Sequence, residues 1–148
     1  MGRARDPTDN MANRAAAECS RQLVAAHLKA LGSGDDCRAT LTDDVTLTFM
    51  ETGEVIRGRN AVTELLTYVH HSAFSAPPVV KALFVEAERA LLEAEFIGQQ
   101  TSEFAGIPAT GHRVHLPYVV AYDLDAHAIR AMRLYLSMNT LVRQLRET

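Results

Sequence analysis

Two side chains in the second half of the chain could take part in proton transfer. His115 lies in a strand-like segment, 113–122, and imidazole is the side chain whose ordinary pKa is closest to neutrality. Glu95 lies in the preceding strand-like segment, 90–100, where its alternation with apolar residues favours an outward, solvated position. The other interpretation makes Glu95 a site carboxylate, because removal from water raises a carboxyl pKa and produces a competent base. His115 and Glu95 are therefore candidate catalytic residues.

Further polar residues lie in segments that are expected to reach a core. His27 is on the apolar stripe of the first predicted helix, either as a hydrogen-bonded core histidine or as a ligand contact. Tyr118 shares a predicted strand with His115 but points to the opposite face, so at most one of them lines a given cavity. His70 and His71 come at the end of a predicted helix, where positive charge favours the helix dipole.

The histidines and cysteines do not form a metal-binding pattern. His70 and His71 are adjacent and point to different sides of a helix, whereas His112 and His115 have no cysteine or carboxylate at ligand spacing. The two cysteines lie far apart, outside any CxxC motif. We expect no metal, and cysteines that stay reduced.

Composition and charge are those of a single domain without a basic binding surface. The chain has 148 residues, of which 47% are hydrophobic, which is enough for one core. With 22% charged residues and a net charge of −3, it lacks the basic patch that nucleic acid requires. No apolar run approaches the roughly 20 residues that cross a bilayer, and the first ten residues are polar. We expect a cytoplasmic protein with no nucleic-acid or membrane partner.

Hydrophobic periodicity predicts a mixture of helices and strands. Residues 1–13 lack a period and are expected to form a flexible leader before a single domain, 14–148. Helices are predicted over 14–31, from the N-cap candidate Asn60 to no later than residue 76, and over 139–146; strands are predicted over 45–50, 54–57, 79–87, 90–100, 113–122 and 129–138. Short turns join the last four strands, which therefore pair antiparallel. The order predicts an α+β layer in which a curved sheet wraps around helices.

The segment 113–122 is apolar on both faces. Alternate positions carry Val114, Leu116, Tyr118, Val120 and Tyr122, and the other face carries Pro117, Val119 and Ala121. Helices of the same chain cover only one face of such a sheet. A homodimer that buries the other face is therefore expected.

Several motifs occur in an order that is typical of one family. They are Asp43-Asp44-Val45 before the first strand, Gly58-Arg59-Asn60-Ala61-Val62 at the second helix, His71-Ser72-Ala73-Phe74 at its end, Gly106-Ile107-Pro108-Ala109-Thr110-Gly111 between two long strands, and Tyr135-Leu136-Ser137 near the end of the chain. With these motifs the chain resembles the SnoaL-like polyketide cyclases, a branch of the nuclear transport factor 2-like and ketosteroid isomerase-like superfamily. The resemblance extends over most of residues 14–145.

The resemblance implies a fold and a class of chemistry. The fold is a cone-shaped barrel of a curved, mostly antiparallel sheet wrapped around N-terminal helices, with a short C-terminal helix and a largely apolar cavity. Superfamily members include polyketide cyclases, ketosteroid isomerases and limonene-epoxide hydrolases, which use no metal and usually no cofactor. The resemblance thus implies a cofactor-independent cyclase, isomerase or epoxide-opening enzyme of secondary metabolism, acting on a hydrophobic polyketide- or terpenoid-like metabolite.

The resemblance also implies which residues of the last strand face the cavity. In that arrangement Arg133 stabilises an enolate or binds a carboxylate, and the Tyr135 hydroxyl donates to a carbonyl oxygen. Periodicity offers the alternative, because Met132, Leu134, Leu136 and Met138 form the more apolar face. Arg133 would then lie outside, in a salt bridge at a dimer contact. Phe49, Tyr118 and His27 are expected to contact the ligand.

Ser137 stands at the position where members with cyclase activity tend to carry an acid. A serine hydroxyl without a partner base does not abstract a proton from carbon at neutral pH. Two hypotheses follow. The first is an enzyme with Arg133, Tyr135, His115 and Glu95 as catalytic residues and Ser137 as a ligand contact. The second is a non-catalytic ligand-binding or interaction module that has lost the acid.

Overall fold

The computed structural model describes residues 7–125 and 127–147. Its elements are α1 (Pro7–Ser33), η1 (Arg38–Thr40), β1 (Leu41–Phe49), β2 (Glu54–Arg57), α2 (Arg59–Thr67), η2 (Tyr68–Ser72), β3 (Phe74–Ser75), β4 (Pro78–Val85), β5 (Arg89–Gln100), β6 (Arg113–Leu124), β7 (Ile129–Tyr135) and α3 (Met138–Arg146). Here η1 is a 3₁₀ turn and η2 a single π-helical turn that continues α2. The predicted α+β class is confirmed.

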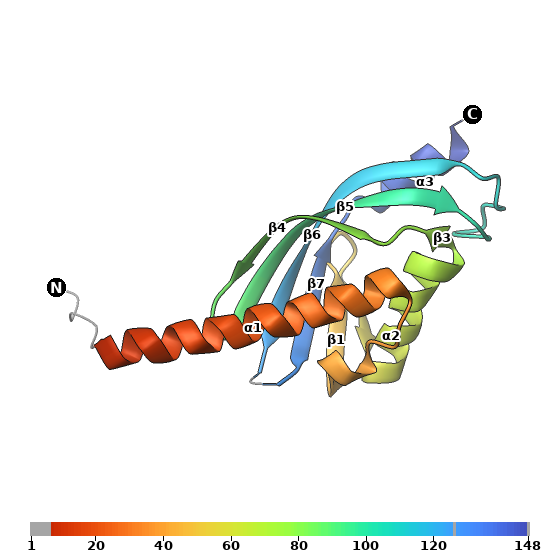
Figure 1. Cartoon of the computed structure of the whole chain (residues 1–148). Coiled ribbons are helices and arrows are strands. Elements are labelled where there is room, and N and C mark those ends of the chain that lie inside the picture. The colour runs from red at the N-terminus through yellow and green to blue at the C-terminus, as the bar shows by residue number, and fades with distance from the viewer. Residues whose placement is uncertain (1–6, 126, 148) are drawn as a thin grey trace.

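The strands form one curved sheet that does not close on itself. Its order is β2-β1-β7-β6-β5-β3, and β4 pairs with β5 beyond the end of β3. β1 and β7 are parallel and the other neighbours are antiparallel, as the short turns predict. Figure 1 shows α1 lying across one face of this sheet, with its first turns extending beyond the strands.

Strict alternation in the two longest strands sorts their side chains between the faces of the sheet. On β5 the residues facing the helices include Leu92, Ala94 and Phe96, all less than 5% exposed, and β6 alternates in the same way. Because the period is two, every polar residue between them faces outward. The core therefore lies between this inner face and the helices.

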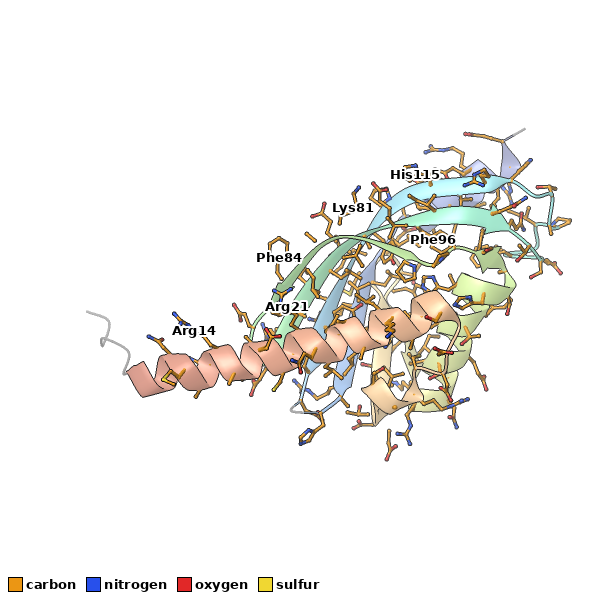
Figure 2. The ribbon with its side chains drawn as sticks, in the orientation of Figure 1. Arg14, Arg21, Lys81, Phe84, Phe96 and His115 are labelled. Atoms are coloured by element: carbon orange, nitrogen blue, oxygen red, sulfur yellow. The ribbon has the colours of Figure 1, made fainter. Side chains whose placement is uncertain are left out.

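The outer face of the sheet carries several exposed apolar side chains. Phe84 is 60% exposed, Leu91 41% and Val79 36%. Phe84 pairs with Leu91, which pairs with Ala121 of β6, so these residues form one row across the sheet. In Figure 2, Phe84 and Lys81 project from the side of the sheet opposite α1. The described helices leave this row uncovered.

Two helix starts differ from the predictions. α1 begins at Pro7, so the predicted leader is helical over 7–13, while residues 1–6 lie outside the described residues. Proline suits a first helical position because its missing N–H would have no partner there, and no further proline or glycine interrupts the chain until Gly32. α2 begins at Arg59 after Gly58, whose φ is 95°, and Asn60 instead accepts a hydrogen bond from Arg38.

The sheet also contains a short strand that periodicity did not predict. β3 pairs with the end of β5, and Gly98 of β5 lies directly against it. A Cβ atom at position 98 would stand 2.1 Å from the carbonyl oxygen of Ser75 and 2.6 Å from Cβ of Ala76. A glycine is therefore required for this close approach of two backbones.

No helix among the described residues is long and apolar enough to span a membrane.

Candidate functional site

A cavity of about 90 Å³ lies between the inner face of the sheet and the helices. Its lining comes from α1, β1, α2, η2, β5, β6, β7 and α3, from Phe104 in the loop that joins β5 to β6, and from Leu136 between β7 and α3. Most of the lining side chains are leucine, valine, methionine and phenylalanine. Figure 2 shows one of them, Phe96, on the side of β5 that faces the helices. The cavity suits an apolar ligand.

Four side chains with polar atoms interrupt this apolar lining: His27, His70, Tyr118 and Tyr122. Among the described residues the lining includes no aspartate, glutamate, lysine or arginine. Chemistry in the cavity therefore depends on imidazole and phenol groups.

His27 is brought to the cavity by the apolar stripe of α1. Its side chain is only 1% exposed, and its Nδ1 lies 2.9 Å from the hydroxyl of Thr40. Burial, with a smaller contribution from the positive charge of a protonated His70, lowers the pKa of His27 to about 4. The imidazole is therefore neutral at pH 7. Its ring also meets the ring of Tyr122 edge-on, with centroids 6.2 Å apart.

His70 is brought to the cavity by the π-helical turn η2. It is 7% exposed, and its Nδ1 lies 2.7 Å from the carbonyl oxygen of Ala76. Burial lowers its pKa, against the opposing effect of the bond to Ala76. The ring packs edge-on against Phe96 at a centroid distance of 5.8 Å. Our sequence interpretation, a histidine at the helix end that favours the dipole, missed this position in the cavity wall.

Tyr118 and Tyr122 contribute two phenol groups from inward positions of β6 that Val120 separates. Burial raises the pKa of Tyr118 to about 12 and that of Tyr122 still further. Both hydroxyls are therefore protonated throughout the physiological range. They are able to donate hydrogen bonds to a ligand oxygen.

The remaining sequence candidates divide into two groups. Tyr118, His27 and Phe49 line the cavity, and their ligand-binding roles stay predictions. Arg133, Tyr135, His115, Glu95 and Ser137 do not line it.

The structure brings His115 and Glu95 together, but on the outer face of the sheet. Nε2 of His115 lies 3.0 Å from a carboxylate oxygen of Glu95, and the Lys81 ammonium lies 3.9 Å from the other oxygen. The His115 side chain is 63% exposed. Alternation along β5 and β6 explains the placement, since Phe96 and Leu116 occupy the inward positions next to them.

Arg133 and Tyr135 also lie outside the cavity, so the inward orientation that the resemblance implied is not observed. The Arg133 guanidinium donates two hydrogen bonds to Asp123, at 2.9 and 3.1 Å. The pKa of the Asp123 carboxyl is lowered, and these bonds are the largest cause. Tyr135 is 47% exposed. Met132 and Leu134 take the inward positions, because the apolar face of β7 packs against the core.

Ser137 has a structural contact in place of a position in the cavity. It precedes α3, and its hydroxyl accepts a hydrogen bond from the backbone N–H of Thr140 at 3.2 Å. This is the geometry of a helix N-cap. β7 consequently ends at Tyr135, before the predicted end of that strand at residue 138.

A curved α+β sheet over an apolar cavity, with a few polar groups in its wall, defines a class of small proteins whose architecture suits a small-molecule site. Comparison with known families is more specific. The model of the SnoaL-like polyketide cyclases matches residues 17–145, and the chain belongs to this family. The family resemblance inferred from the sequence motifs is thus confirmed.

Solved structures of low sequence identity share the fold. A candidate SnoaL-like polyketide cyclase from Jannaschia sp. CCS1 is 18% identical over 99% of both chains, with a TM-score of 0.80. A candidate polyketide cyclase from Xanthomonas campestris pv. campestris is 23% identical over 88% of this chain and 98% of its own, with a TM-score of 0.75. AclR, a candidate hydroxylase from Streptomyces galilaeus, is 18% identical over 84% and 83%, with a TM-score of 0.72. No curated protein matches the chain.

Proposed function

We propose that this protein is a cofactor-independent enzyme that binds a hydrophobic small molecule and moves a proton on it. The observation that carries the proposal is the pair of buried, neutral imidazoles, His27 and His70, in the wall of an apolar cavity. Membership of the SnoaL-like family supports a cyclase, isomerase or epoxide-opening reaction on a polyketide- or terpenoid-like metabolite.

The cavity has the groups that such a proton transfer requires. A neutral imidazole accepts a proton from carbon or from a hydroxyl, and desolvation then disfavours the imidazolium that forms. An enolate or alkoxide on the ligand would compensate that positive charge at short range. The hydroxyls of Tyr118 and Tyr122 would donate hydrogen bonds to the developing oxygen anion in surroundings that exclude water.

A non-catalytic ligand-binding protein is the second candidate. It is favoured by the lack of a carboxylate in the lining described above and by the capping role of Ser137. The depressed pKa of His27 points in the same direction, because a weakly basic imidazole is a poor proton acceptor until a ligand charge raises its pKa.

A thermal-shift screen followed by turnover assays separates the two candidates. Aromatic polyketides, terpenoid epoxides and steroids are the classes to screen, since a cavity ligand raises the melting temperature according to its affinity. An enzyme is expected to turn over a stabilising compound, and His70→Phe is expected to lower kcat/KM about 100-fold or more. The exposed His127→Ala variant serves as the control with unchanged turnover. Stabilisation without turnover of any compound would favour the binding protein.

We also propose that the outer face of the sheet forms a homodimer. Support comes from the outer row of Phe84, Leu91 and Ala121, in which Phe84 and Leu91 are exposed and which the chain's own described helices leave uncovered. Light scattering after size-exclusion chromatography is expected to give twice the chain mass of 16.3 kDa. Phe84→Arg is expected to produce monomers, and a monomeric wild-type protein would contradict the proposal.

A further inference from the structure

The hydrogen bond between His27 and Thr40 determines which ring nitrogen carries the proton. The hydroxyl of Thr40 donates its single hydrogen to the carbonyl oxygen of Cys37, at 2.7 Å. Toward His27 that hydroxyl is therefore an acceptor, so Nδ1 of His27 must donate at 2.9 Å. A neutral imidazole has one N–H only, which leaves Nε2 of His27 unprotonated.

The same reasoning applies to His70 with a simpler partner. Its Nδ1 lies 2.7 Å from the carbonyl oxygen of Ala76, and a carbonyl oxygen only accepts. Nδ1 of His70 is therefore the protonated nitrogen, and Nε2 carries a lone pair. Two independent protein contacts thus select the same tautomer in two buried rings.

Both rings direct this unprotonated nitrogen away from their protein partners. Nδ1 of each ring is bonded to a neighbouring segment, η1 for His27 and the β3–β4 connection for His70. Because Nδ1 of each ring is held by the protein, we infer that the edge carrying Nε2 is the part of each ring that lines the cavity. The cavity wall therefore offers two hydrogen-bond acceptors.

Charge further limits what binds beside these acceptors. As described above, no acidic or basic side chain of the described residues lines the cavity. A ligand carboxylate or ammonium would be buried without a fixed counter-charge, which is costly in an apolar environment. The lone pairs of neutral imidazoles repel an anionic oxygen as well.

We propose that the ligand is an uncharged, largely apolar compound that donates a hydroxyl hydrogen, from a phenol, enol or alcohol, to Nε2 of His27 or His70. This inference rests on the proposed small-molecule function and specifies the chemical class. An ether or hydrocarbon of the same shape fills the cavity but leaves the Nε2 acceptors without a hydrogen-bond donor. The cost of such unpaired buried polar groups is the main source of discrimination between the analogues.

The experiment is calorimetric titration of the full chain at pH 7.5 with four probes of one ring system: 2-naphthol, 2-methoxynaphthalene, naphthalene and 2-naphthoate. We expect 2-naphthol to bind at least about tenfold more tightly than its methyl ether. His27→Phe and His70→Phe are each expected to reduce this ratio, and the double variant is expected to bring it close to one. The matched control is His112→Phe, because His112 also bonds a backbone carbonyl, that of Leu145, but lies outside the cavity lining.

The outcomes separate this inference from the function on which it rests. Equal affinity for 2-naphthol and its ether would overturn the inference and leave the binding function intact, whereas failure of all four probes to bind would contradict both. If 2-naphthoate bound most tightly of the four probes, and its affinity rose as the pH fell, the result would indicate an imidazolium–carboxylate pair. That outcome would overturn the inference. Long-range ¹H–¹⁵N spectra of the wild-type protein show which ring nitrogen of each histidine carries the proton, so they test the tautomers without variants. A protonated Nε2 on both His27 and His70 would contradict the assigned tautomers.

Discussion

Replacing Gly98 with alanine probes the closest approach of two backbone segments in the fold. The added Cβ would lie 2.1 Å from the Ser75 carbonyl oxygen and 2.8 Å from Cα of Ala76. Ordinary contacts between non-bonded heavy atoms are near 3.5–4.0 Å, so β3 has to retreat by roughly 1.5 Å. The obstacle is backbone paired to β5, not a flexible side-chain tip, so the retreat strains the β3–β5 pairing.

The expected cost of Gly98→Ala is at the upper end of what overpacking produces, about 3 kcal/mol in the free energy of unfolding. For a chain of this size that corresponds to a fall in Tm of roughly 6–12 °C. Ligand affinity is expected to fall as well, because the displaced Ala76 holds Nδ1 of His70. Urea denaturation and a thermal melt measure the first effect, and a titration with 2-naphthol measures the second.

Gly32→Ala is the matched control for this experiment. Gly32 lies within α1, and a Cβ there would meet no atom within 4 Å. The free energy of unfolding is expected to stay unchanged or to rise by up to about 1 kcal/mol, because alanine has the higher helix propensity. A Gly98→Ala protein whose stability lies within about 0.5 kcal/mol of the wild type would refute the packing argument.

Three further predictions concern His27, Arg133 and Ser137. Between pH 7 and pH 4 the wild type is expected to lose about 3 kcal/mol more stability than His27→Leu, because the unfolded chain gains a proton near pH 6.5 and the native His27 only near pH 4. The extra stability from the neutral, buried His27 is present above pH 6.5 and is lost as the pH falls. Urea titrations of both proteins at several pH values measure it. Equal pH dependence of the unfolding free energy in the wild type and His27→Leu would contradict the prediction. A double-mutant cycle of Arg133→Ala and Asp123→Asn is expected to give a coupling of about 1 kcal/mol, and zero coupling would count against the observed ion pair. Ser137→Ala is expected to cost about 1 kcal/mol in a thermal melt and Ser137→Gly less, whereas equal losses would argue against the N-cap.

The architecture could be predicted from the sequence because its longest strands each bury one face. Along β5 and β6 apolar residues occupy every second position over most of each strand and these positions are buried, so a shift of one residue would expose the entire inner face. The four-residue strand β2 matched its prediction for residues 54–57. The two-residue strand β3 could not be predicted, since its position depends on the close contact with Gly98 far along the chain.

The cavity wall was less accessible to sequence reasoning. His70 lies in η2, the π-helical turn that continues α2, where the regular helical period no longer holds. One signal was present: His70 stands four residues after Leu66, on the apolar stripe of the predicted helix. For Arg133 the simple alternation gave the correct face, whereas the analogy with the family's last strand did not, because Asp123 provides a partner on the outer face.

A crystal structure of the protein grown with 2-naphthol would test the central claim, a ligand-binding cavity between the sheet and the helices. We expect the naphthol ring among the apolar side chains of this cavity, with its oxygen about 3 Å from Nε2 of His27 or His70. Naphthol bound only on the outer face, or a cavity filled by its own side chains, would contradict the claim.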